Sequence, residues 1–420
     1  MALKIVNTES LDAVADAINA KAGTSGKLQF PDGFVSAVEG ISAGGGGGDG
    51  YDVATMQKFV DARGIQFLYS YSYYNNTNNS GLPVTNDDLK WLAKVDLSNW
   101  DSAYYMFYSC ESSKWDAIPL FDTSHITNMT YMFTGASASQ RRKNSIFIPD
   151  FDTSNATTMQ CMFQCRKLKN FPNLNYSNVT VVSYMFNESA FDTPPEIPNL
   201  DFPNVAGNIN SLFRTANIAK VGNINAPKVK EVYQSFYQCR KLQSVGNIDL
   251  NGGEGSWYQA FYYCDTLTTI GSINARPTNI YGIFSNCAVL DGVSLDLRSC
   301  TTASDAFSSC KALTNLTLKN IKVNLQVGSR TYYGHLLTVD SLVGLCYELR
   351  DTGSVKTLTI GSANLEKLAS VYVRSIEITD AMRAEDDLID EKLPFERCDS
   401  TDEGATLIGD YVLLKNWKLA

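Results

Sequence analysis

Histidine and charge are both scarce in this chain. Only two of its 420 residues are His, and only 19% are charged. Few His residues argue against zinc sites and against His-based acid–base catalysis. The formal net charge is -9, so the chain should repel phosphate backbones, and we expect no nucleic-acid partner. The hydrophobic share of 44% predicts a folded protein.

Long apolar runs are also lacking. Crossing a bilayer takes about 20 apolar residues in succession, so we expect no membrane insertion. The first ten residues lack the apolar centre of a secretory signal. The sequence therefore predicts synthesis in a cytoplasm without export by a standard route.

Sequence signatures of catalysis are missing too. There is no Gly-x-Ser-x-Gly elbow, no His-Glu-x-x-His and no phosphate loop ending in Gly-Lys-Ser/Thr. The Gly44–Gly48 run therefore predicts a flexible linker over residues 42–50. The acidic run Glu385–Glu391 lacks the ligand spacing of a calcium loop and indicates a solvated helix face. We expect no enzyme, metal or cofactor, although a catalytic carboxylate pair could still meet in the fold.

A recurring phenylalanine is the main positive feature. Its spacings are 26, 30, 23, 27, 23, 25, 23 and 23, through Phe107, Phe133, Phe163, Phe186, Phe213, Phe236, Phe261, Phe284 and Phe307. Cys often follows three residues later, and Leu three after that, as in Phe236, Cys239 and Leu242. Apolar residues then continue at short spacing, which predicts a strand with one buried face. The stretch before each Phe reads as helical or turn-like.

A strand and a return segment in 23 residues are typical of a leucine-rich repeat. One such unit cannot bury its apolar edge, whereas stacked units share one core. We predict an α/β repeat over residues 101–325, a solenoid with a parallel sheet. The repeated Cys could form disulfides or a metal site, but one Cys per repeat favours a column of buried structural thiols.

Two blocks carry a resemblance to a known family. They are Phe121-Asp122-Thr123-Ser124 through Met132-Phe133, and Phe151-Asp152-Thr153-Ser154 through Met162-Phe163. Their Asp-Thr-Ser…Met…Met-Phe pattern resembles BspA-type leucine-rich repeats. That family occurs in bacterial surface adhesins and in phage tail proteins, so the resemblance implies binding.

Residues 1–41 form a separate predicted unit. Apolar residues at helical spacing predict a small helical module that oligomerises or docks through Leu11, Val14, Ile18, Phe30, Phe34 and Val38. The segments Ala15–Lys21 and Phe30-Pro31-Asp32-Gly33-Phe34 are similar to an N-terminal module found in tail proteins of phages infecting Gram-positive bacteria. The resemblance implies attachment to the virion.

The solenoid should be capped at both ends. Residues 51–100 predict an N-terminal cap, and residues 326–420 an α/β C-terminal cap with an appendage. In the first cap, Tyr69, Tyr71, Tyr73 and Tyr74 alternate with Ser before an Asn-rich loop. Such aromatics either pack on the first repeat or bind sugars.

Polar positions between the buried strand residues are the other candidate ligand contacts. They are Gln243, Ser244, Thr268, Thr269, Asn315 and Thr317. Together with the resemblances, they predict a phage tail-fibre or receptor-binding protein. We expect it to be a homotrimer in the virion, made in the host cytoplasm, with tail or baseplate proteins and a host glycan or protein as partners. A bacterial surface adhesin and a polysaccharide-degrading tail enzyme are the alternatives.

Overall fold

The computed structural model describes residues 53–54, 57, 61, 92–108, 117–135, 145–327, 337–360, 363–364, 367 and 417–419. The chain divides into two compact units, Met1–Thr193 and Pro194–Ala420, and each is described by itself. The predicted module at 1–41, the linker at 42–50 and the four tyrosines Tyr69, Tyr71, Tyr73 and Tyr74 lie outside the described residues.

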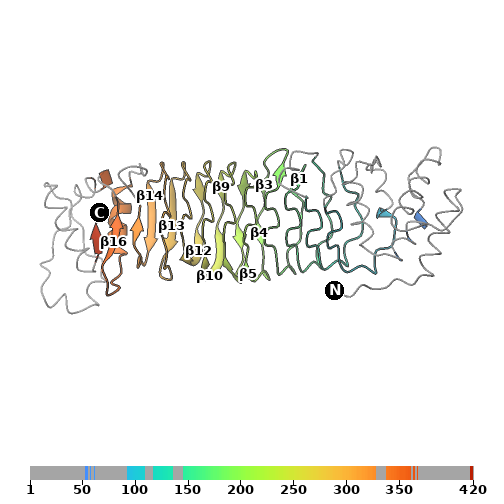
Figure 1. Ribbon diagram of the computed structural model, residues 1–420, viewed down its shortest axis with the longest axis horizontal. Helices are drawn as coiled ribbons and strands as arrows, with labels where there is room; N and C mark the ends of the chain where they lie inside the picture. Colours follow the sequence, from blue (N-terminus) through green and yellow to red (C-terminus); the bar gives the residue numbers. More distant parts are fainter. Residues whose placement is uncertain are drawn as a thin grey trace, which may run out of the picture. The chain divides into compact units, whose positions relative to one another are not determined.

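Short parallel strands from successive repeats form the second unit (Figure 1). One four-stranded sheet has the order β11-β9-β6-β3, with β3 Glu196–Ile197, β6 Lys220–Val221, β9 Ser244–Val245 and β11 Thr269–Ile270. A second has the order β12-β10-β7-β4, with β4 Leu200–Asp201, β7 Ile224–Asn225, β10 Ile248–Ser256 and β12 Ile273–Asn279. Each repeat therefore adds one strand to each sheet, and we call one such repeat a rung of the solenoid.

Smaller sheets extend the same arrangement. Parallel pairs join β5 Gly207–Asn208 to β8 Val229–Glu231, and β13 Gly292–Asp296 to β14 Asn315–Lys319. A three-stranded sheet contains β15 Leu325–Gln326, β16 Lys356–Thr359 and β17 Trp417–Leu419. In the first unit, β1 Lys167–Leu168 pairs with β2 Ala190–Phe191, and isolated parallel bridges join Ser102, Asn128, Thr158 and Val181. The predicted parallel-sheet solenoid is confirmed, with little helix among the described residues.

The phenylalanines stack in the core as the repeat predicts. In the first unit the rings of Phe107, Phe133, Phe163 and Phe186 follow one another at 5.2, 5.4 and 5.1 Å. In the second, those of Phe213, Phe236, Phe261, Phe284 and Phe307 follow at 5.6, 4.9, 5.3 and 6.1 Å. All nine side chains are buried, so each rung supplies one ring to a continuous aromatic column within its unit.

Four cysteines of the second unit form the expected column of buried free thiols. Each Sγ donates a hydrogen bond to the carbonyl of the Phe one rung earlier: Cys239 to Phe213, Cys264 to Phe236, Cys287 to Phe261 and Cys310 to Phe284, at 2.9 to 3.1 Å. Burial raises the pKa of all four thiols. The thiols thus satisfy carbonyls that face the core, and none is paired in a disulfide.

The segment around each Phe is turn-like rather than helical. Residues two before and two after the Phe have left-handed backbones, such as Gln234 and Gln238 (φ 51° and 56°) around Phe236. Their N–H groups, with that of Phe236 between them, donate to the next rung at Tyr258, Ala260 and Tyr262. The intervening N–H groups close turns within the rung, as those of Tyr237 to Gln234 and Cys239 to Phe236 do at 3.1 Å. Every second N–H is thus left for the neighbouring rung, whereas a helix would bond only to itself.

The strand predicted after each Leu is often two strands with a corner between them. Val245 ends β9, Ile248 begins β10, and Gly246-Asn247 makes the turn that separates them. The side-chain oxygen of Asn223 accepts a hydrogen bond from the N–H of Asn247 at 2.9 Å, and the oxygen of Asn199 does the same for Asn223 at 2.8 Å. The corner was not predicted because it depends on amides stacking between rungs.

A helix follows the last long strands, where helical periodicity predicts a cap. Helix α5 (Val339–Tyr347) begins at Thr338, whose side chain accepts a hydrogen bond from the N–H of Ser341. The hydroxyl of Ser341 accepts one from the N–H of Leu316 on β14 at 3.0 Å. The helix therefore covers part of the edge of β14. Among the described residues, no helix has the length and apolar character needed to span a bilayer.

Candidate ligand-binding face

Two columns of tyrosine lie beside the buried phenylalanines of the second unit. The first stands three residues before Phe236, Phe261 and Phe284, and the second stands directly after the first two of these. We call the columns, with the two glutamines between them, the tyrosine face: Tyr233, Tyr258 and Tyr281; Tyr237 and Tyr262; Gln234 and Gln259. Because the Phe is buried and its neighbours have left-handed backbones, the flanking side chains point outward.

The rings of each column stack on one another. Tyr233 and Tyr258 have centroids 5.1 Å apart at 8°, and Tyr258 and Tyr281 are 5.1 Å apart at 9°. In the second column, Tyr237 and Tyr262 are 5.2 Å apart at 12°. Tyr233 is 37% exposed, and the other four are half-buried. The face is thus a rigid array with its ring edges toward solvent.

Polar and cationic groups frame these rings. Gln234 donates through Nε2 to Oε1 of Gln259 at 2.9 Å, which ties two rungs together between the columns. The guanidinium of Arg214 lies 5.2 Å from the ring centre of Tyr237, and that of Arg240 lies 5.1 Å from that of Tyr263. Both are cation–π contacts at the side of the face.

Two phenols of the face, those of Tyr258 and Tyr262, have raised pKa values. Partial burial raises the pKa of Tyr258, and the neighbouring Tyr233 and Tyr281 add to it. Burial likewise raises the pKa of Tyr262, with contributions from neighbouring tyrosines and from Asp305. The phenols of Tyr258 and Tyr262 thus act as hydrogen-bond donors as well as acceptors.

This combination is suited to binding. Tyrosine offers a large amphipathic contact area at low entropic cost, and amides add adaptable hydrogen bonds. Tyr and Arg are also the residues that most often dominate binding energy at interfaces. Within the described residues, no group of three or more His, Cys, Asp or Glu side chains is placed to hold a metal ion.

The polar positions singled out from the sequence lie elsewhere, on the strands. Gln243 and Thr268 are joined by the N–H and the hydroxyl of Thr268, which both donate to the Gln243 carbonyl, at 2.8 and 2.9 Å. Ser244 pairs with Thr269 in the sheet, and Asn315 and Thr317 lie on β14, with exposed side chains. Gln243 and Thr268 directly precede β9 and β11, and Ser244 and Thr269 begin these two adjacent strands. Their part in binding stays a prediction.

Sequence reasoning missed the tyrosine face, although a signal was present. Once the repeats are aligned on the Phe, Tyr stands three residues earlier at Tyr104, Tyr233, Tyr258 and Tyr281. In the first unit the same region gathers Tyr105 and Tyr131, stacked 4.8 Å apart at 1°, with Tyr104 against both. Comparing the outward-facing positions on either side of the aligned Phe would have revealed both groups of tyrosines.

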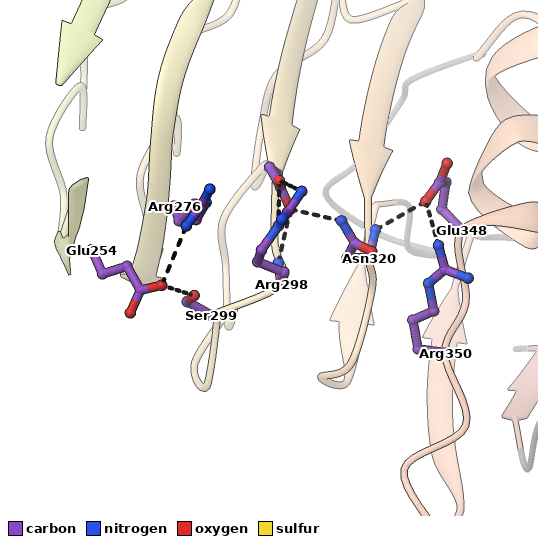
Figure 2. A network of polar contacts seen from close by, with 8 residues as sticks. Glu254, Arg276, Arg298, Ser299, Asn320, Glu348 and Arg350 are labelled. Carbon is purple, nitrogen blue, oxygen red and sulfur yellow. Dashed lines mark hydrogen bonds and ion pairs between the residues drawn. The ribbon is translucent and has the colours of Figure 1, made fainter. Parts of the chain in front are cut away.

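A second polar surface on the second unit is a chain of paired charges (Figure 2). Arg276 lies 4.0 Å from Glu254, which also accepts from Ser299, and Arg350 lies 3.7 Å from Glu348. Between them, Arg298 Nε and Asn320 Nδ2 donate to Asp296 at 2.7 and 2.9 Å.

These pairs leave little net charge. Partial burial alone would raise the pKa of Asp296, but the hydrogen bonds from Arg298 and Asn320 outweigh it and hold that pKa below its usual range. Each of the three arginines in Figure 2 has its own carboxylate, so the surface links rungs and offers no unbalanced charge to an ionic ligand.

Comparisons with known proteins give one finding. Two overlapping stretches, residues 101–218 and 166–257, match a family described as "Mycoplasma protein of unknown function, DUF285". No curated protein and no solved structure matches the chain. Over residues 101–257, which include Tyr233 and Tyr237 of the tyrosine face, the chain is thus similar to a family whose description assigns no function.

Proposed function

We propose that this chain is a recognition protein of a phage tail, a tail-fibre or receptor-binding protein that binds a glycan or protein on the host cell surface. The observation that carries the binding role is the tyrosine face, a stacked and partly exposed array on a rigid scaffold. The resemblances to BspA-type leucine-rich repeats and to a tail module supply the rest of the proposal, namely the repeat family and the virion.

The architecture supports recognition through its regularity. Each rung repeats the backbone of the last, so neighbouring rungs present side chains at a fixed spacing. Stacked repeats of this kind give extended binding surfaces whose side chains are held before the ligand arrives. Little conformational entropy is then lost on binding, which favours affinity for a surface ligand.

In this proposal residues 1–41 attach the chain to other tail or baseplate proteins, and the chain is a homotrimer. Three copies would turn a weak single contact into durable attachment, because the second and third contacts form at high effective concentration. Deleting residues 1–41 should then prevent incorporation into particles while leaving the unfolding midpoint of the solenoid unchanged.

Binding of the labelled full chain to a panel of intact Gram-positive cells, measured by flow cytometry, tests the proposal. The double variant Tyr233→Ala/Tyr258→Ala removes two stacked rings, and we expect at least about a 10-fold loss of binding to the cells that wild type binds. The matched control is Val355→Ala, which truncates a 59% exposed apolar side chain away from the face. A double variant that binds as well as the control would overturn the proposal, as would the absence of binding to every cell type.

A further inference from the structure

The tyrosine columns end abruptly at one side. Gln259 donates its N–H to the carbonyl of Tyr281 at 2.9 Å, and Gly282 donates to that of Ser304 at 3.0 Å, so Ser304 is the next residue of the first column. By the same pairing, Tyr263 donates to Ser285, which follows Tyr262 in the second column. Both columns thus step from tyrosine to serine in the same direction.

Longer polar side chains stand at the opposite ends of the columns. Before Tyr233 stands Asn210, whose Oδ1 accepts the N–H of Tyr233 at 3.0 Å and whose Nδ2 donates to Glu231. Before Tyr237 stands Arg214, whose guanidinium covers that ring. Longer side chains therefore occupy the space beside the first rings, whereas short ones follow the last.

Stacking decides which ring faces a ligand can reach. Tyr258 lies between Tyr233 and Tyr281, so both of its faces are covered. Tyr281 stacks on Tyr258 with one face, and the other is turned toward the exposed Ser304. Within the described residues no second ring stacks on it. The outer face of Tyr281 therefore lies beside a short side chain, which leaves room for a flat ligand.

The groups around this end are polar, and one is acidic. Asp305, next to Ser304, is exposed and close enough to Tyr262 to oppose ionisation of its phenol. Gly282, between the two columns, carries no side chain, and a Cβ there would lie 3.5 Å from the ring of Tyr262. A flat ligand on Tyr281 would occupy the rung of Ser304 and Asp305 and would meet a serine hydroxyl and a carboxylate at its edge. A carboxylate disfavours nucleotides, whose phosphates it repels.

We infer that the ligand is a saccharide, and that one pyranose ring stacks on the outer face of Tyr281, beside Ser304, with its hydroxyls bonded to Ser304 and Asp305. This inference rests on the proposed function and names its ligand class. The apolar C–H face of a pyranose suits the negative face of an aromatic ring, and a carboxylate can accept from two neighbouring hydroxyls. A protein ligand would instead use the row of hydroxyls along the columns.

The test extends the tyrosine column. Ser304→Tyr adds a fourth ring to the column. This ring stacks on Tyr281 and covers the proposed site. Asn210→Tyr extends the same column at the other end and is the matched control. Tyr281→Ala removes the stacking surface, and Tyr281→Phe keeps it. All are made in the full chain, with thermal unfolding followed by circular dichroism to confirm that each variant folds.

The probes are cellohexaose, maltohexaose and chitohexaose, with binding followed by saturation-transfer NMR and titration calorimetry. We expect wild type to bind at least one probe, and Ser304→Tyr and Tyr281→Ala to lose about 10-fold or more in affinity. Asn210→Tyr and Tyr281→Phe should stay within about threefold of wild type.

Two results would overturn the inference. One is wild-type protein that binds none of the three probes. The other is Ser304→Tyr protein that folds and binds like Asn210→Tyr. Neither decides the proposed function. If cell binding still depends on Tyr233 and Tyr258, the first result points to a protein ligand and the second to a saccharide site elsewhere on the chain. The proposed function itself would be wrong if wild type bound no cells, or if the Tyr233→Ala/Tyr258→Ala variant bound them as well as its control.

Discussion

The side-chain oxygen of Asn223 accepts the N–H of Asn247 at 2.9 Å, one rung further along the second unit. Asn247 repeats the contact with the N–H and hydroxyl of Ser272, at 2.9 and 3.0 Å. These amides replace the backbone partners that the chain loses where it turns between two strands. The relationship sets the corner of these rungs and fixes how closely they approach.

A glycine therefore stands where the corner packs against the amide of the preceding rung, at Gly222, Gly246 and Gly271. A Cβ on Gly246 would lie 2.5 Å from Oδ1 of Asn223 and 2.8 Å from the backbone carbon of Gly222. We expect Gly246→Ala to lower the free energy of unfolding by about 1–3 kcal/mol, because the rungs must separate. The measurement is urea unfolding followed by circular dichroism.

The control for this change is Gly344→Ala in α5, where a Cβ would meet nothing within 4 Å. Alanine in a helix interior is about 0.5–1 kcal/mol more stable than glycine, so this variant should gain stability. Equal losses in the two variants would mean that the corner is not tightly packed.

In the first unit, a buried arginine stands where other rungs have cysteine. Arg166 follows Phe163 by three residues and is 3% exposed. Its Nε donates to the carbonyl of Phe133 at 2.8 Å, and its Nη2 to that of Phe107 at 3.2 Å. Arg166→Ala should cost about 3 kcal/mol or more, since two buried carbonyls lose their donor.

The matched variant is Arg166→Cys, which installs the side chain that donates to the preceding Phe carbonyl in the second unit. It should cost less than Arg166→Ala by about 1 kcal/mol, the net value of one hydrogen bond. Both are measured by urea unfolding under reducing conditions. If Arg166→Cys is the less stable of the two, the thiol and the guanidinium do not play equivalent roles.

The features that repeat along the chain could be predicted from the sequence, and the contacts between rungs could not. The Phe spacing and the Cys three residues later identified the buried columns, because a position that is buried in every rung recurs in the sequence as the same apolar residue type. The left-handed backbone of Gln234 could not be predicted, since Gln, unlike Gly or Asn, does not indicate a positive φ. Likewise, Tyr258 reads as an available aromatic in the sequence, but both its faces are covered by neighbours some 25 residues away.

The buried thiols should make the fold sensitive to base. Burial raises the pKa of Cys310 to about 12 and moves that of Cys287 well above 9.0. Unfolded thiols keep the ordinary value and release protons above it, so rising pH favours unfolding. Each thiol's contribution is complete below pH 9.0 and diminishes by about 1.4 kcal/mol per pH unit above it.

Cys287→Ser tests this directly, because serine can still donate to the carbonyl of Phe261 but does not titrate. Between about pH 8 and pH 10, the variant should lose about 1.4 kcal/mol less than wild type in urea unfolding under reducing conditions. The tyrosines titrate alike in both proteins and cancel in the comparison. Parallel pH profiles for the two proteins would refute the role of Cys287.

The last prediction concerns the helix at the edge of β14. Ser341 accepts from the N–H of Leu316 at 3.0 Å, and its own N–H donates to the hydroxyl of Thr338 at 3.3 Å. Ser341→Ala should cost about 1 kcal/mol, because the strand edge loses an acceptor, and Thr338→Ala a similar amount, because the helix loses its cap. Asp340→Asn, in the same turn, should cost only about 0.5 kcal/mol through the helix dipole. Hydrogen exchange at Leu316 separates the two stronger variants: Ser341→Ala should speed it more than Thr338→Ala, and equal rates would mean that the hydroxyl of Ser341 does not protect the strand.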